Sequence, residues 1–347
     1  MPDWILNLVE SPQQRVLLAT ALLGLVFGGL AQWSRFCLLR ALVNSYQGKG
    51  LAGLRLYLLA LAVAVAATQL LVISPSIDLG ASLYVQADAP LLLLLFGGVL
   101  FGYGMTLANA CGARSLVLLG SGNLRSLVTL LALALGAGMV SSGVLAPLRM
   151  GLEEASRVSL PWLQLPSWLG GLMALALLLW TLSSVQLRSS PQFWAAGMGI
   201  GLCIPAGWWI TGFLGADDFE PVRLASLTFV APVAEAQQYL HLATGTRLSF
   251  GIILVAAVIA GAALRALASG EFSWQFFETP SQLRGSLFGG WMMGVGGVLA
   301  LGCTLGQGLT GISTLALPSF VAFIGILLGC WLRLRWPGAA KTSGARV

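Results

Sequence analysis

The chain has 347 residues, of which 57% are hydrophobic and only 9% are charged, and its mean hydropathy is +0.88. Soluble proteins carry charge on about a quarter of their residues, so this composition excludes a soluble globular protein and indicates an integral membrane protein. The net charge of +6 sits in short loops between apolar runs, where basic residues report membrane topology, and it indicates no nucleic-acid partner.

Long runs without charge define the predicted membrane-spanning segments. The first seven each approach the ~20 residues that cross a hydrocarbon core, and the last has the length of two crossings. These runs are 16–34, 56–77, 89–113, 126–148, 158–187, 189–216, 248–264 and 285–332. We therefore expect a multi-pass all-α protein in a lipid bilayer.

The basic residues predict the orientation of these spans. They flank the loop after the first run and follow the last run: Arg35, Arg40, Lys49, Arg55, Arg333, Arg335, Lys341 and Arg346. Because cytoplasmic loops are enriched in Lys and Arg, we expect an outside N-terminus, a cytoplasmic C-terminus and an odd number of spans. No cleavable signal peptide is evident at the start of the chain.

A repeat organises the chain. GGVLFGYGMTLANACG begins at Gly97, and GGWMMGVGGVLALGC begins at Gly289. A shift of 192 residues aligns seven identities: Gly97/Gly289, Gly98/Gly290, Gly102/Gly294, Gly104/Gly296, Leu107/Leu299, Ala108/Ala300 and Cys111/Cys303. A weaker echo relates Gly24 and Gly28 to Gly197 and Gly201. The repeat predicts one membrane domain over 1–347, with half one at about 16–147, a linker at about 148–168, half two at about 169–336 and a cytoplasmic tail at 337–347.

Each repeat ends in a glycine-rich break that delivers a cysteine. Broken helices at corresponding positions of two halves are typical of a transporter site near the bilayer midplane. The segments after Cys111 and Cys303, beginning at Gly112 and Thr304, can start half-helices whose N-termini attract anions. Arg35 and Arg114 add positive charge, although Arg114 is equally interpreted as a loop anchor. Asn109 and Gln307 are also interpreted as partners of the carbonyls that the breaks expose.

The remaining cysteines and the single histidine exclude several other sites. Cys203 and Cys330 have apolar neighbours, which favours a packing role. The five cysteines contain no CxxC pair, and His241 is the one histidine. This excludes a disulfide scaffold, bis-His haem within one chain and an ordinary zinc site. We expect no metal and no cofactor.

Three motifs carry a resemblance to a known family. Ser34-Arg-Phe-Cys37, Asn109-Ala-Cys-Gly112 and Leu301-Gly-Cys-Thr-Leu-Gly-Gln-Gly-Leu309 resemble the YeeE/YedE family of sulfur-transport membrane proteins. The resemblance implies about nine transmembrane helices plus short re-entrant half-helices in two pseudosymmetric halves. It implies a permease of the bacterial inner membrane that takes up thiosulfate or a related sulfur-containing anion along a narrow path lined by Cys37, Cys111 and Cys303. A soluble TusA-like sulfur carrier often accompanies the family.

Some features leave alternatives open. Gly-Ala-Arg-Ser follows Cys111 in place of the smaller pattern of the family, so another sulfur or selenium species remains a candidate substrate. A membrane thiol oxidoreductase or sulfurtransferase would use Cys111 or Cys303 as its nucleophile. A passive channel for small solutes would also use paired half-helices. We expect transport and no enzymatic activity, because no nucleotide-binding motif and no general base accompany the cysteines.

Overall fold

The computed structural model describes residues 12–73, 77–85, 88–159, 164–184, 190–216 and 222–336. The predicted tail at 337–347 and part of the predicted linker lie outside these residues. The helices longer than ten residues are α2 (Pro12–Trp33), α4 (Ala52–Ile73), α5 (Leu91–Ala108), α7 (Leu124–Ser141), α9 (Ser167–Leu182), α11 (Pro191–Trp209), α12 (Val230–His241), α13 (Phe250–Ala268), α14 (Pro280–Leu299) and α15 (Leu317–Arg335).

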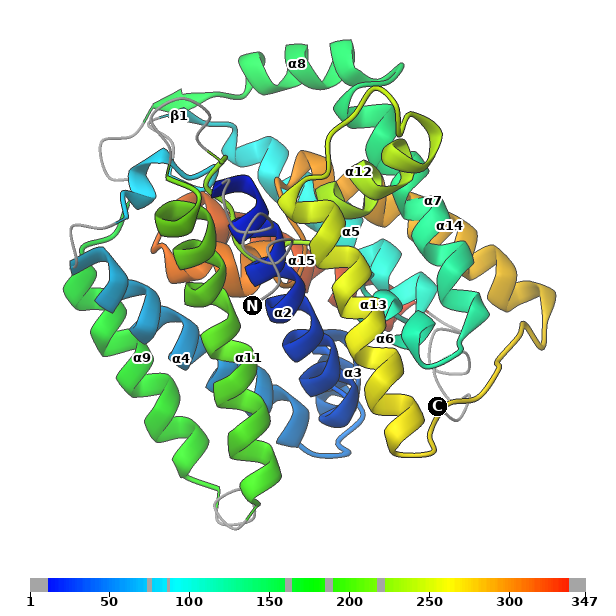
Figure 1. Ribbon diagram of the computed structural model, residues 1–347, viewed down its shortest axis with the longest axis horizontal. Coiled ribbons are helices and arrows are strands. Elements are labelled where there is room, and N and C mark those ends of the chain that lie inside the picture. Colours follow the sequence, from blue (N-terminus) through cyan, green and yellow to red (C-terminus); the bar gives the residue numbers. More distant parts are fainter. Residues whose placement is uncertain are drawn as a thin grey trace, which may run out of the picture.

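Shorter elements connect these helices. They are α3 (Leu38–Tyr46), η1 (Leu79–Ala81), α6 (Gly112–Gly120), α8 (Ala146–Ala155) and the π-helical turns η2 (Ile210–Leu214) and η3 (Gly306–Gly311). Strands β1 (Asp88–Ala89) and β2 (Val158–Ser159) form one antiparallel pair. β1 and α8 lie together at one end of the bundle (Figure 1). The described residues form an all-α architecture, as the sequence predicts.

Among the described residues, seven helical segments have the length and composition to cross a membrane. The apolar helix α9 is shorter, with 16 residues, and α14 is a continuous helix of 20 residues that is rich in glycine. The number of spans predicted, about nine, therefore stays a prediction. Large apolar side chains such as Leu22, Leu92 and Phe96 point outward and are more than half exposed. Such a surface suits a hydrocarbon environment, where apolar side chains cost nothing to expose.

The centre of the bundle is the crossing of the two repeated helices, α5 and α14, which pack against each other. A Cβ on Gly104 would lie 2.7 Å from the carbonyl oxygen of Gly289, and one on Gly296 would lie 2.6 Å from that of Gly97. The 192-residue shift relates Gly104 to Gly296 and Gly97 to Gly289, so it converts each of these contacts into the other. The sequence repeat therefore corresponds to a pseudo-twofold axis in the structure, which passes between α5 and α14.

The outer helices pair across the two sequence halves. α2 packs against α13, and α11 packs against α4, so a helix from each half of the sequence lies against the other half (Figure 1). Gly28 faces the carbonyl oxygen of Val258, and Gly201 faces that of Ala60. The weak sequence echo between Gly28 and Gly201 thus corresponds to equivalent close approaches of helices, which small residues permit in membranes. The two halves interleave.

Candidate functional site

The same backbone turn precedes each of the three motif cysteines. Just after the end of each of the helices α2, α5 and α14, one residue adopts a left-handed backbone conformation, and a cysteine follows two residues later. These residues and their φ angles are Arg35 (53°), Asn109 (58°) and Leu301 (53°). Only one other non-glycine residue in the described chain, Leu315, has a positive φ. Because this conformation costs an L-residue about 1–2 kcal/mol, the turns are held by the packing around them.

Each turn places its cysteine at the start of the next short helical segment. The carbonyl oxygen of Cys37 accepts the N–H of Ala41 at 3.1 Å. The equivalent acceptor distances are 2.9 Å for Cys111 and 2.7 Å for Cys303. At Cys303 the sulfur also accepts the backbone N–H of Gly306 at 3.3 Å. Cys37 and Cys111 are therefore the N-cap residues of α3 and α6, where unpaired N–H groups and the helix dipole favour negative charge. Cys303 lies three residues before the π-helical turn η3.

The tertiary fold brings these helix starts together. The thiols of Cys37 and Cys111 are hydrogen-bonding neighbours, and Cys111 also contacts the side chain of Thr304. Thr304 adjoins Cys303, whose sulfur neighbours the Thr228 side chain and the backbone N–H of Phe229. A sequence of sulfur and hydroxyl groups thus runs from Thr228 through Cys303, Thr304 and Cys111 to Cys37. Cys111 and Cys303 are buried, and Cys37 is partly exposed.

A small cavity lies between Cys37, Cys111, Arg114 and Thr304, with a volume of about 10 Å³. One water molecule needs roughly that space. In this conformation the cavity therefore admits nothing larger than a water molecule. An ion that passes must widen the gap, so the site has the form of a constriction.

Tyr57 of α4 forms one wall of this constriction. Its hydroxyl group donates a hydrogen bond of 2.7 Å to the carbonyl oxygen of Thr304. Its ring stacks between Phe36 and Phe323, with centroid distances of 5.6 Å and 6.2 Å. Tyr57 is 2% exposed, so this bond is shielded from water. The residue fixes the backbone between Cys303 and η3 relative to α4.

We expect Tyr57→Phe to lower stability, because it leaves the buried Thr304 carbonyl without its partner. The cost of such an orphaned acceptor is about 1–3 kcal/mol. Thermal unfolding of the purified protein in detergent measures the loss. The control is Tyr46→Phe, at a side chain that is 54% exposed. Equal melting temperatures for both variants would contradict the assignment of Tyr57 as a positioning residue.

Positive charge surrounds the Cys37 end of the constriction. Arg40 and Arg114 act electrostatically on Cys37. Arg114 is 8% exposed, and its Nη1 donates to the carbonyl oxygen of Ala31 at 3.5 Å. In the described chain its side chain has no carboxylate within salt-bridge distance. An anion at the thiols would provide the compensating charge that a buried arginine requires.

The pseudo-twofold relation extends to the third thiol, with a difference. The shift of 192 residues relates Ser34 to Ser226 and Cys37 to Phe229. As Cys37 contacts Cys111, the backbone of Phe229 contacts Cys303. Thr310 of η3 holds this second loop by donating a 2.7 Å hydrogen bond to the carbonyl oxygen of Leu227. The symmetric site thus carries a phenyl ring in place of a thiol, which makes the two ends of the path chemically different.

The other residues proposed from the sequence occupy different places. Gly112 begins α6 beside the cavity. Arg35 is exposed and pairs with Glu271 at 3.5 Å, outside the constriction. Asn109 is exposed and lines a separate, larger cavity. Gln307 donates to the Ala300 carbonyl oxygen at 2.6 Å, while its Oε1 is buried without a hydrogen-bond partner. It lines a second cavity of about 10 Å³ with Tyr84 and Ser319.

Sequence reasoning missed Tyr57, Thr228 and Arg40. When the 192-residue alignment is extended beyond the strong repeat, Phe36, the residue before Cys37, aligns with Thr228. The repeat could therefore have indicated Thr228. Tyr57 lies within a long apolar run of α4, where one aromatic residue gives no distinguishing pattern. Arg40 lies three residues after Cys37, one turn into α3.

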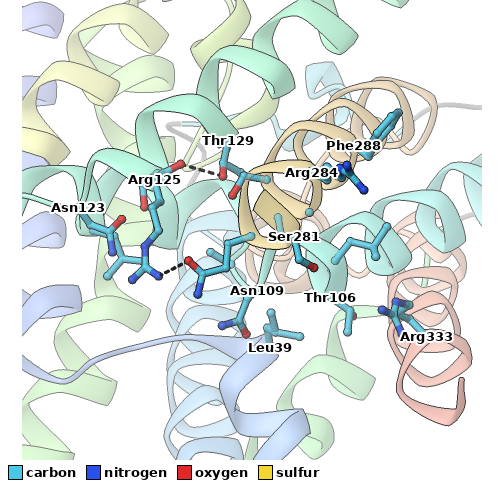
Figure 2. A pocket seen from close by; sticks show the side chains of 18 of the residues that line it. Leu39, Thr106, Asn109, Asn123, Arg125, Thr129, Ser281, Arg284, Phe288 and Arg333 are labelled. Carbon is cyan, nitrogen blue, oxygen red and sulfur yellow. Dashed lines mark hydrogen bonds between the residues drawn. The ribbon is translucent and has the colours of Figure 1, made fainter. Parts of the chain in front are cut away.

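Two larger cavities flank the constriction at opposite ends of α13. One, of about 660 Å³, is lined by Thr228, Tyr84 and the start of α13 at Ser249 and Phe250. The other, of about 620 Å³, is lined by Asn109, Arg125 and residues at the start of α14 and the end of α15 (Figure 2). The loop after α13 reaches this second end, where the N–H of Leu124 bonds the Gln275 carbonyl oxygen at 3.0 Å. The thiols and the cavity of about 10 Å³ therefore lie between two larger cavities.

Comparisons with known proteins agree with this geometry. A family model described as sulphur transport matches residues 33–332. The chain is 23% identical over 340 residues to the thiosulfate transporter TsuA of Escherichia coli, with 91% of this chain and 93% of the relative covered. It is 28% identical over 349 residues to the thiosulfate transporter TsuA of Spirochaeta thermophila, with 89% and 96% covered. Because the family model spans most of the chain, this protein belongs to the sulphur transport (YeeE/YedE) family.

Proposed function

We propose that the protein is a permease that takes up thiosulfate, and that the ion passes Cys303, Cys111 and Cys37 in turn. The observation that carries the proposal is the set of contacts that links the thiols of Cys37 and Cys111, through Thr304, to Cys303 between two larger cavities. The names of the two relatives support thiosulfate as the substrate. Membership of a transport family gives no support to the oxidoreductase, sulfurtransferase or passive-channel alternatives.

The chemistry of the constriction suits a divalent anion that has both oxygen and sulfur at its surface. Thiol S–H groups can donate hydrogen bonds to the oxygen atoms of the ion. The polarizable sulfur atoms accept a soft terminal sulfur as a neighbour. Arg40 and Arg114 stabilise the negative charge near Cys37. No covalent step is required, and each thiol releases the ion to the next by a small displacement.

The proposed orientation follows from the basic residues. We place the opening near Ser249 outside and the opening near Arg125 in the cytoplasm of a bacterial inner membrane, with the N-terminus outside and the C-terminus cytoplasmic. The assignment of α9 and α14 as further spans brings the number to nine and agrees with this orientation. The half boundaries and a cytoplasmic TusA-like carrier that receives the ion at the inner opening are part of the same proposal.

Uptake by reconstituted protein tests the function. We expect proteoliposomes that contain the purified protein to accumulate ³⁵S-labelled thiosulfate, and unlabelled thiosulfate to compete much better than sulfate, which lacks the terminal sulfur. Protein-free liposomes are the control. Accumulation equal to that of protein-free liposomes would contradict the proposal, and equal competition by sulfate would contradict recognition through the thiols.

A further inference from the structure

The cavity of about 620 Å³ at the inner end has a strongly basic lining. Arg125 of α7, Arg284 of α14 and Arg333 of α15 contribute side chains to it, and no aspartate or glutamate lines it. In Figure 2, Arg125 lies on one side of the cavity, and Arg284 and Arg333 lie on the other. We call this cavity the arginine chamber. Three cations around one space repel one another unless an anion is present.

The charges of the arginine chamber are not neutralised by the described protein. Arg125 has only neutral side-chain partners, the amide oxygens of Gln282 and Gln275, each at 3.4 Å. The Nη1 of Arg333 is buried and has no hydrogen-bond partner. In the described ranges, none of the three guanidinium groups has a carboxylate within salt-bridge distance. A buried guanidinium donor without a partner costs free energy, which a bound oxyanion would recover.

The arginine chamber is lined by residues close in sequence to two of the thiols. Ala110, the residue before Cys111, lines its wall, and so does Leu39, two residues after Cys37. Neutral donors also line the wall, among them Thr106, Asn109 and Ser281 (Figure 2). An ion that leaves the Cys111–Cys37 pair towards this end therefore enters a space with cationic and neutral hydrogen-bond donors. Guanidinium groups bind the oxygen atoms of oxyanions through paired N–H donors.

We propose that the arginine chamber is a second anion-binding site, which receives divalent oxyanions at the inner end of the path through Arg284, Arg333 and Arg125. The direction in which the ion moves through the chamber rests on the proposed function. The binding of an oxyanion in the chamber rests on its geometry alone. The chamber offers N–H and O–H donors but no thiol, so it recognises the oxygens of the ion. It therefore binds sulfate as well as thiosulfate, in contrast to the thiol constriction.

Binding of sulfate to the purified full-length protein in detergent separates the two sites. We expect isothermal titration calorimetry to detect sulfate binding that weakens as chloride is added, because salt screens the arginines. The double variant Arg284→Gln/Arg333→Gln should bind sulfate about ten-fold more weakly or worse, which corresponds to losing one charged hydrogen bond. Arg333→Lys keeps the charge and should retain most of the binding. Cys203→Ala, at a buried thiol that does not line the chamber, should leave sulfate binding unchanged.

The matched control is Arg335→Gln. Arg335 lies on α15 two residues from Arg333, but its guanidinium group covers the ring of Trp331 at 4.0 Å and it does not line the chamber. Its sulfate affinity should equal that of the unmodified protein. Absence of sulfate binding to the unmodified protein, or equal losses in the Arg335→Gln and Arg284→Gln/Arg333→Gln variants, would overturn the proposal.

The phosphate of an acidic lipid headgroup is also an oxyanion. A second set of measurements with added lipid distinguishes a lipid site from a site for the transported ion. Sulfate binding is repeated in detergent micelles supplemented with phosphatidylglycerol or with phosphatidylcholine. Equal binding in both supports a site for the transported ion, whereas loss of binding with phosphatidylglycerol alone assigns the chamber to lipid and overturns the proposal. Sulfate binding without thiosulfate uptake by the unmodified protein would support the chamber and contradict the proposed function.

Discussion

Replacement of Cys111 by alanine is expected to lower thiosulfate uptake by about ten-fold or more. Cys111 is the one thiol of the constriction that neighbours both another thiol, that of Cys37, and the side chain of Thr304. It is 4% exposed, so water cannot replace a hydrogen bond that is lost there. A hydrogen bond to a charged group contributes about 1.5–3 kcal/mol. Loss of one such bond at the narrowest point predicts at least a ten-fold fall in uptake rate.

The variants Cys111→Ser and Cys203→Ala sharpen this experiment. Serine keeps a donor but loses the polarizable sulfur, so we expect residual uptake with reduced preference for thiosulfate over sulfate. Cys203 on α11 is equally buried and has no thiol neighbour among the described residues, so Cys203→Ala should transport normally. The measurement is ³⁵S-thiosulfate uptake at equal amounts of reconstituted protein. Undiminished uptake by Cys111→Ala would contradict the thiol path.

The sequence predicted the parts of the fold that repeat. Seven aligned identities located α5 and α14, the break after each and the cysteine that follows. The segment beginning at Gly112 does start a helix, α6, as predicted. Cys303 starts a helical turn in the same way. These features were accessible because a break in an apolar helix requires glycine, polar side chains or both in a short window, and the repeat showed that the window occurs twice.

The interleaving of the halves was not predictable from the same data. Apolar runs are uniformly hydrophobic in a membrane, so their periodicity does not select a partner helix. The pairing of α2 with α13 is set by the fit of Gly28 against the carbonyl oxygen of Val258. That fit depends on backbone positions more than two hundred residues apart.

Two of the proposed site residues show why motif proximity does not place side chains. Arg35 and Asn109 each lie two residues before a cysteine, yet both are exposed. Their left-handed backbone reverses the chain, so the cysteine turns inward while their own side chains face outward. Their role at this position is conformational, and Asn is among the few residues that tolerate it. Leu301 occupies the equivalent position in the second half with the same φ.

Substitution of Gly104 or Gly296 is expected to produce a large loss of stability. A Cβ on Gly296 would lie 2.5 Å from the backbone nitrogen of Phe101, and one on Gly104 would lie 3.0 Å from that of Met293. Backbone atoms cannot move aside as a flexible side chain can, so α5 and α14 would have to separate. Overpacking of this kind costs about 1–3 kcal/mol for a small group. Gly104→Ala and Gly296→Ala should each lower the melting temperature, and Gly296→Val should lower it further.

Pseudosymmetry gives this prediction a quantitative check. Because the two contacts are related by the twofold axis, Gly104→Ala and Gly296→Ala should destabilise the protein by similar amounts. The double variant should lose less than their sum, since one separation of α5 from α14 relieves both clashes. Gly138 on α7 is the control, because a Cβ there meets no atom within 4 Å, and Gly138→Ala should be neutral or stabilising. Thermal unfolding monitored by size-exclusion chromatography measures all four variants. Strict additivity of the two clashes would contradict a shared helix crossing, and with it the axis that brings Cys111 and Cys303 to the centre.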